Sequence, residues 1–319
     1  MGVFDFIPAV KKHNQAEELN RSAQETVSSA KKWIKRKKSH LQLTFEDYGR
    51  LKFLVLSEDI SRFVTTFEKI KNVDFSSDFN KDDVSKISFD KNDLIQLKNT
   101  SLTIQELATD GITAIGSGAL TGMAVYGTVG MLASASTGTA ISTLSGAAAT
   151  NATLAWLGGG ALAAGGGGMA TGALVLGGVV AAPVLAVGYI VFNAKADKNL
   201  ALAKTNKLKA KQYQQEISLA VAKIDAIVSR VKQMKSVLTE LSELLRINTS
   251  KLDRIIKVHG TEYSVFPEEA KKDIYTTVLL AQATKSILDI QLLDDKGNMT
   301  SDSEQYLVEN KKFLDSIRQ

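Results

Sequence analysis

The sequence predicts an all-α protein in which long antiparallel, coiled-coil-like helices surround an uncharged, Gly/Ala-rich hydrophobic helical hairpin. Three observations lead to this prediction. The chain has only 3 Pro in 319 residues, well below the usual share of about 5%, so long uninterrupted helices are expected. Apolar residues recur at helical spacing in the charged parts of the chain. Residues 111–194 contain no Asp, Glu, Lys, Arg or His.

The distribution of charge divides the chain into three regions. Charged residues make up 23% of the whole chain, so chance does not explain their absence from residues 111–194. This region also holds 19 of the 23 Gly. We therefore expect an N-terminal long-helix region at 1–110, a Gly/Ala-rich membrane-insertion region at 111–194, and a C-terminal region at 195–319 with a long helix and a terminal helical hairpin.

In the N-terminal region, residues 8–72 contain one Gly, Gly49, and no Pro after Pro8. This stretch is predicted to form one long helix or two closely linked helices. Its apolar residues at helical spacing are Leu41, Phe45, Tyr48, Ile60, Phe63, Phe67 and Ile70. Residues 74–93, rich in Asp, Ser, Asn and Lys, predict a connection. A shorter helix is expected at 94–109.

In the C-terminal region, residues 193–259 contain neither Gly nor Pro and predict one long helix. Its apolar residues follow alternating steps of four and three: Ile217, Val221, Ile224, Val228 and Val231, then Leu241, Leu245, Leu252 and Ile255. Such steps are typical of a seam that needs a partner helix, and the N-terminal long helix is the natural candidate. Gly260 is expected to end the helix, Pro267 to open the next one, and Thr300 or Ser301 to cap the last.

Within the uncharged region, residues 169–192 are long enough to cross the hydrocarbon core of a bilayer. The residues predicted to form this span include Val179, Val180, Pro183, Leu185, Tyr189 and Phe192. Residues 111–132 form a second, more polar candidate span. Residues 133–151 carry many Ser and Thr, which suit a turn at the far side of a membrane or a wet path.

Small residues recur at every fourth position of the uncharged region and predict a smooth helix face for close packing in a membrane. They are Ala114, Gly118 and Gly122, followed by Gly160, Ala164, Gly168 and Gly172. We therefore expect self-association into a homo-oligomer. The alternative is that a Gly/Ala-rich composition produces this spacing without function. The four consecutive Gly at 165–168 favour a break that makes a hairpin.

A segment of Gly, Ala, Ser and Thr gains little free energy on entering lipid and can instead be buried within protein. This property suits a protein that is stored in one form and inserts when triggered. The alternative is a soluble protein in which a tightly packed Ala/Gly helical core stays buried.

Two basic clusters flank the uncharged region, and the chain as a whole carries a net charge of +5. The first cluster surrounds Trp33, and its cations are Lys31, Lys32, Lys35, Arg36, Lys37 and Lys38. The second follows the uncharged region and includes Lys195, Lys198, Lys204 and Lys207. Both clusters could bind anionic lipid headgroups or nucleic acid. The alternative is that they are solvated helix surfaces without a binding function.

Several functional classes are disfavoured. The absence of Cys removes disulfides and thiolate chemistry, and the three His, His13, His40 and His259, are far apart in sequence. Residues 165–172 lack the Lys-Ser/Thr pair of a phosphate-binding loop. Residues 294–302 do not align with a calcium loop and predict a turn between helices. No catalytic residue, metal site or cofactor is predicted, and we do not expect an enzyme.

The glycine-rich block 145–160, continuing through residue 169, resembles a segment of a bacterial family of glycine-zipper helical membrane proteins. Residues 51–57, 62–64 and 67–73 resemble the same family. The architecture is similar to α-helical pore-forming proteins and, among defence proteins, to the channel-forming effector of Hailong-type anti-phage systems. This resemblance implies an effector that a nucleic-acid oligomer holds inactive until infection.

Together these observations predict a membrane-inserting, oligomeric channel- or pore-forming effector, in which residues 111–192 insert. Membrane lipid, further copies of the chain, and a regulatory nucleic-acid oligomer or protein are the predicted partners. The N-terminus lacks the features of a secretory signal, so we expect a cytoplasmic inactive form and an inner-membrane active form. The alternative is a helical binding scaffold or adaptor, soluble or membrane-anchored, without a pore.

Overall fold

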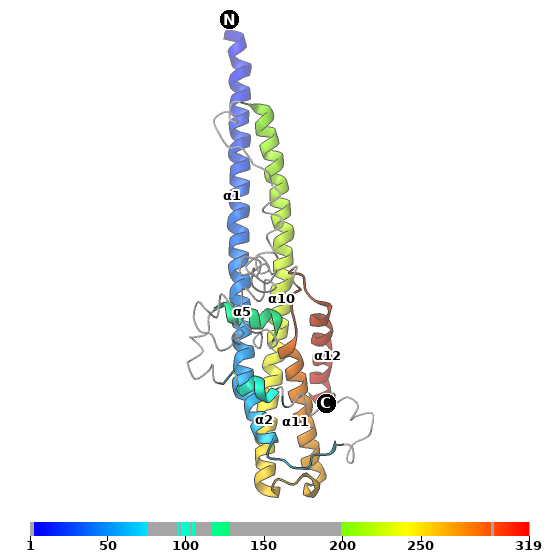
Figure 1. The fold of residues 1–319 in the computed structure, drawn as a ribbon. Helices are drawn as coiled ribbons and strands as arrows, with labels where there is room; N and C mark the ends of the chain where they lie inside the picture. Colours follow the sequence, from blue (N-terminus) through cyan, green and yellow to red (C-terminus); the bar gives the residue numbers. More distant parts are fainter. Residues whose placement is uncertain are drawn as a thin grey trace, which may run out of the picture. The chain divides into compact units, whose positions relative to one another are not determined.

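A computed structural model describes residues 3–75, 95, 97–102, 104–105, 117–127, 199–294 and 297–318. Throughout these ranges the regular secondary structure is helical and contains no strand, which confirms the all-α prediction (Figure 1). The labelled helices are α1 (Val3–Leu54), α2 (Ser61–Phe67), α5 (Ser117–Tyr126), α10 (Leu200–His259), α11 (Glu268–Asp289) and α12 (Ser301–Arg318). A single π-helical turn, η1 (Val55–Ile60), joins α1 to α2, so the predicted N-terminal helix is nearly continuous.

The chain forms two compact units, and both long helices contribute to each of them. In its described part, unit 1 consists of α1 up to Leu43 and α10 up to Ser229. Unit 2 contains the rest of α1 and α10 together with α2, α5, α11 and α12. The two units are described separately below.

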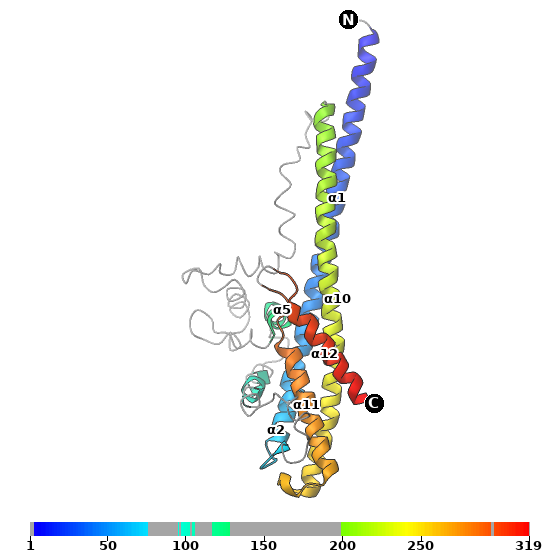
Figure 2. The same ribbon diagram turned by 90° about the vertical axis from the view of Figure 1, so that its right-hand side faces the viewer.

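The two long helices run parallel, so the predicted antiparallel arrangement is wrong. In unit 1, Asn20 is hydrogen-bonded to Asn206 and Lys37 is paired with Asp225, so residue numbers rise together along both helices. Figure 1 and Figure 2 show the same direction for both helices. Antiparallel neighbours result from short connections, whereas residues 68–199 connect these helices and are numerous enough to return the chain to the beginning of α1.

Unit 1 combines small buried side chains with larger ones, which include Ile34, Leu41, Tyr213, Ile217 and Ile224. Its buried alanines are Ala16, Ala23 and Ala30 on α1 and Ala203, Ala210 and Ala220 on α10. Small side chains shorten the distance between helix axes. The side chain of Asn206 donates a hydrogen bond of 2.9 Å to that of Asn20 between α1 and α10. A buried Asn pair fixes the register of two helices, because any shift leaves both amides unsatisfied.

Unit 2 has a core of large side chains. The buried residues of α1, η1 and α2 include Phe45, Tyr48, Phe53, Leu56, Ile60 and Phe63. Those of α10 include Met234, Leu238, Leu241 and Leu245. The helices remain parallel here, since Lys69 pairs with Asp253 and Lys235 with Asp47. The predicted seam of α10 is therefore buried except for Ile255, which is half-buried, and α1 is one of its partners.

The expected ends of the C-terminal helices are confirmed. Gly260 ends α10 with a φ of 83°, a left-handed conformation that suits Gly. Pro267 immediately precedes α11. The side chain of Thr300 accepts a hydrogen bond from the backbone N–H of Ser303 and caps α12. The predicted turn between α11 and α12 contains a hydrogen bond of 2.7 Å from the backbone N–H of Asn298 to Asp294 Oδ1.

Within the described part of the chain, no helix combines the length and the apolar character needed to cross a membrane. The predicted span at 169–192, with Val179, Val180, Pro183, Leu185, Tyr189 and Phe192, lies outside the described residues.

Candidate functional site

The described part of the uncharged region is buried in unit 2. It comprises α5 and the following residue, Gly127. Every residue from Leu120 to Val125 is buried, and so is Gly127. Because consecutive helical residues point in all directions, α5 is enclosed around its whole circumference over this stretch, which is typical of a helix that is apolar on every side.

Gly49 allows the backbone of α1 to touch α5. A Cβ atom placed on Gly49 would lie 1.9 Å from the carbonyl O of Leu120, far inside van der Waals contact. No residue other than Gly fits there unless one of the two helices moves. The single Gly of the predicted N-terminal helix therefore lies where that helix meets the uncharged region.

The end of α5 is held by the chain around the C-terminus of α11. Gly127 has a φ of 69°, and a Cβ atom placed on it would lie 2.4 Å from the carbonyl O of Asp289. Just beyond α11, the backbone N–H of Leu292 donates a hydrogen bond of 2.6 Å to the carbonyl O of Val125. We call the surroundings of α5 the seat, and its defining residues are Gly49, Lys52, Leu288, Asp289 and Leu292.

Lys52 is a fully buried cation in the seat, with none of its surface exposed. Its Nζ donates a hydrogen bond of 3.0 Å to the carbonyl O of Leu288, in the last turn of α11. A cation at this position also interacts favourably with the helix dipole. The same Nζ lies 4.9 Å from the centroid of the Tyr48 ring, one turn earlier on α1.

The environment of Lys52 favours its neutral form. Burial lowers the pKa of Lys52 to about 7, and the nearby carboxylate of Asp289 opposes this shift in part. Asp289 also pairs with Lys285 at 2.8 Å. Burial raises the pKa of Tyr48, and its hydroxyl has no hydrogen-bond partner among the described residues. The seat therefore contains an ionisable group that titrates near neutral pH.

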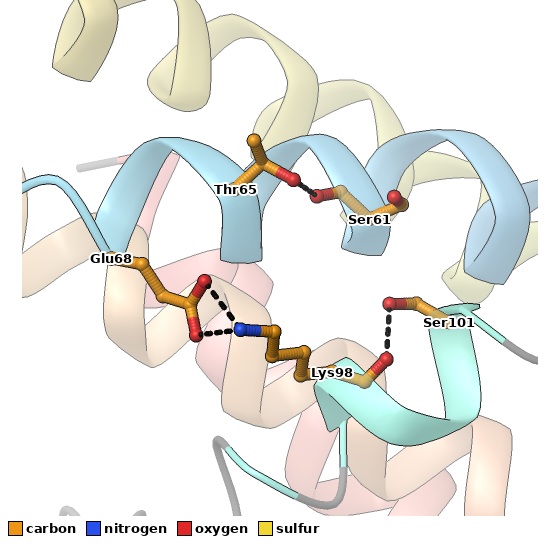
Figure 3. Close-up of polar contacts among 5 residues, drawn as sticks. All are labelled: Ser61, Thr65, Glu68, Lys98 and Ser101. Carbon is orange, nitrogen blue, oxygen red and sulfur yellow. Dashed lines mark hydrogen bonds and ion pairs between the residues drawn. The ribbon is translucent and has the colours of Figure 1, made fainter.

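A short helical segment before α5 is fixed to α2 (Figure 3). Lys98 Nζ lies 2.8 Å from Glu68 Oε1 at the end of α2. Gln105 Nε2 donates a hydrogen bond of 3.2 Å to the carbonyl O of Ser57 in η1. Since Leu97 and Ile104 are also buried, the chain is anchored to unit 2 shortly before it enters the uncharged region.

Of the predicted small-residue face, Gly118 and Gly122 lie in α5, and Gly122 is buried. The other members, Ala114, Gly160, Ala164, Gly168 and Gly172, lie outside the described residues. Packing of this face in a membrane oligomer stays a prediction.

The first basic cluster lies on the unit 1 part of α1. Lys31, Lys32, Lys35, Arg36 and Lys38 are exposed, whereas Trp33 and Lys37 are half-buried. Lys204 and Lys207 lie on α10, where Lys207 contacts the hydroxyl of Ser22. Lys195 and Lys198 lie outside the described residues.

Sequence reasoning missed both Gly49 and Lys52 as residues of the site, although the sequence carries a signal for each. A Gly inside a long helix costs about 1 kcal/mol relative to Ala, which indicates a position where a side chain does not fit. Phe45, Tyr48 and Lys52 are separated by three and then four residues. This helical spacing places Lys52 on the apolar face of α1.

Comparisons with models of protein families, with curated proteins and with solved structures find no match to this chain. The resemblance drawn from the glycine-rich block therefore stays a hypothesis.

Proposed function

We propose that this protein is a membrane-inserting, oligomeric channel- or pore-forming effector that stores its uncharged region against a helical body until it is triggered. The observation that carries the proposal is the burial of α5. A segment selected to exclude charge is held in unit 2 by contacts with the backbones of α1 and α11. The inactive form is assigned to the cytoplasm and the active form to the inner membrane.

The chemistry of the segment supports storage. Residues 120–125 carry no charge and exchange one apolar environment for another when they leave the seat for lipid. Lipid tails are about as apolar as Leu, so burial in the seat provides little hydrophobic free energy that a bilayer would not also provide. The contacts that hold the segment are specific ones, and their loss is sufficient to release it.

Release from the seat should therefore activate the protein without its natural trigger. We expect Gly49→Leu, which drives a side chain into the backbone of α5, to increase dye leakage from anionic liposomes at least tenfold over wild type. Arg50→Leu is the matched control, because Arg50 is the exposed neighbour of Gly49 on the same helix. Circular dichroism of each variant checks that its helices remain folded.

A second substitution tests whether the uncharged region enters lipid. A charge at the centre of a membrane helix costs about 2.5–3.5 kcal/mol on insertion scales. Adding Val179→Asp to Gly49→Leu should therefore return leakage to the wild-type level. Continued leakage from the double variant would exclude residues 169–192 as the inserting span.

The alternative is a helical scaffold or adaptor without a pore. The observation in its favour is that no described helix meets the criteria for a membrane span. If Gly49→Leu exposes α5 to limited proteolysis and leakage stays at the wild-type level, the scaffold replaces the effector as the proposed function.

A further inference from the structure

We infer that the described part of unit 1 is a membrane-docking arm whose partner is an anionic phospholipid surface. The basic arm of unit 1 consists of residues 10–43 of α1 together with residues 199–229, of which 200–229 belong to α10. The inference rests on the proposed function, because it names the surface to which the stored segment would be delivered.

The basic arm concentrates the positive charge of the chain. It carries fourteen Lys and Arg against five Asp and Glu, although the net charge of the entire chain is only +5. The rest of the chain therefore has a net negative charge. Between Thr26 and Leu43, α1 has no acidic residue at all. Such segregation favours binding of the arm, rather than the body, to an anionic surface.

The cations of the arm remain available to a partner. Among the described residues, Lys31, Lys32, Lys35, Arg36 and Lys38 have no ion-pair partner, and all five are exposed. Only Lys37 of this cluster is paired, with Asp225 at 2.6 Å. The cluster therefore presents uncompensated charge, and a lipid headgroup or a phosphate can supply the missing anions.

Exposed apolar side chains on the same arm favour lipid over nucleic acid. Leu219 is 74% exposed and Leu208 is 59% exposed. The hydrogen-bonded pairs Asn20–Asn206 and Lys37–Asp225 are 186 and 188 residues apart, which places Leu219 level with Lys32. An exposed Leu at the level of a Lys is suited to the boundary between headgroups and acyl chains, whereas the phosphates of a nucleic acid offer it no apolar surface.

Aromatic residues give the second argument against nucleic acid. Single-stranded nucleic acids are held by bases that stack on exposed aromatic rings. On the basic arm, Tyr213 is buried and Trp33 is half-buried. The described arm therefore lacks an open stacking platform, although it has both the charge and the aliphatic contacts for a lipid surface.

Docking of the basic arm would bring the uncharged region to the membrane. α10 begins at Leu200, six residues after the uncharged region ends at Ala194. An arm bound to anionic lipid would hold the C-terminal end of that region close to the bilayer.

Vesicle co-sedimentation with the full-length chain tests the inference. We expect binding to vesicles that contain phosphatidylglycerol and not to vesicles of phosphatidylcholine alone. Each Lys near an anionic surface contributes roughly a fivefold increase in binding, so K31Q/K35Q/K38Q should weaken the partition coefficient by about 100-fold. The matched control is K232Q/K272Q/K312Q, which removes the same charge from exposed positions of unit 2 and should change binding less than about twofold.

A second variant separates lipid from nucleic acid. Leu219→Ser should weaken binding to anionic vesicles several-fold, with Val258→Ser as its control, because Val258 is equally exposed on unit 2. Binding of fluorescent single- and double-stranded oligonucleotides is measured in parallel. Equal losses of vesicle binding from both triple variants would overturn the inference. Oligonucleotide binding that K31Q/K35Q/K38Q abolishes, with vesicle binding unchanged, would replace lipid by nucleic acid as the partner.

The same assay distinguishes failure of this inference from failure of the proposed function. If wild type binds anionic vesicles through the arm and Gly49→Leu causes no leakage, the arm is confirmed and the effector is wrong. If Gly49→Leu causes leakage that K31Q/K35Q/K38Q does not alter and both proteins bind vesicles equally, the effector stands and the arm inference is overturned.

Discussion

The same two helices build both units, but they use different side chains in each. In unit 1 the seam between α1 and α10 begins with Ala residues and the hydrogen-bonded pair Asn20 and Asn206, and it continues with larger residues such as Ile34, Ile217 and Ile224. In unit 2 the core contains Phe, Tyr, Leu, Ile and Met, and a further helix, α5, is enclosed. Small residues in a seam bring two helices close together, whereas large side chains keep them farther apart.

The two units therefore have different roles: unit 1 fixes the alignment of α1 and α10, and unit 2 holds α5. The Asn pair of unit 1 specifies the alignment of two parallel helices at some cost in stability. The seat of unit 2 holds an uncharged helix by close backbone contacts at Gly49 and Gly127, and Lys52 links α1 to the last turn of α11. Variants that act on one unit should therefore leave the other largely unchanged.

The largest effect is expected at Gly49. Gly→Ala inside a helix normally stabilises by about 1 kcal/mol, but here the new Cβ would lie 1.9 Å from a carbonyl O of α5. Gly49→Ala should therefore destabilise unit 2 by about 3 kcal/mol, the upper range for overpacking. Urea unfolding followed by circular dichroism measures the change. Unchanged or increased stability would mean that α5 does not contact α1 at this position.

The second effect concerns pH and Lys52. Its pKa falls from the ordinary Lys value to about 7 on folding, so between pH 7 and about 10 the unfolded chain binds one proton more than the folded chain. Stability should therefore rise with pH in this window, with a slope approaching 1.4 kcal/mol per pH unit. Below pH 7 the cost of burying the charge is fully present.

The matched variant for this slope is Lys52→Met, which keeps the length of the side chain and removes the titrating group. The free energy of unfolding of Lys52→Met should be nearly independent of pH between 7 and 9. Lys285→Met is the control, because Lys285 is a partly exposed cation that pairs with Asp289 from the same helix. A slope that survives in Lys52→Met would assign the pH dependence to another group.

The third effect concerns the Asn pair of unit 1. Asn20→Leu removes the side-chain acceptor of the buried 2.9 Å hydrogen bond from Asn206, which should destabilise the protein by about 1–3 kcal/mol. The double variant Asn20→Leu/Asn206→Leu removes both amides and should recover most of this loss, while weakening the preference for one register. Thermal unfolding measures stability, and additive effects of the two substitutions would show that the amides do not depend on each other.

The sequence predicted those parts of the fold that depend on local chemistry. Gly260, Pro267 and Thr300 mark the helix ends where a positive φ, a missing N–H and a capping hydroxyl are needed. The turn after α11 was likewise predictable, because Asp294 and Gly297 are common turn residues. These features require no knowledge of distant contacts.

The relative direction of the long helices was not predictable from their seams. Steps of three and four describe the buried face of one helix and are the same for parallel and antiparallel partners. The length of the connection at 68–199 was the better guide, because only a long connection allows parallel neighbours. Lys52 was overlooked for a different reason: its spacing places it on the apolar face of α1, but the sequence does not reveal the distant carbonyl group of Leu288 that accepts its hydrogen bond.

The smallest effect is expected at the ion pair between Glu68 and Lys98. Both side chains are about 40% exposed, so water screens their attraction and the entropy of fixing two long side chains opposes it. Lys98→Gln should change the free energy of unfolding by less than about 0.5 kcal/mol, because the buried neighbours Leu97 and Ile104 continue to hold the segment against unit 2. Urea unfolding, with the exposed and unpaired Lys232→Gln as control, measures this difference. A loss several times larger would mean that the ion pair, rather than apolar burial, anchors the chain before it enters the uncharged region.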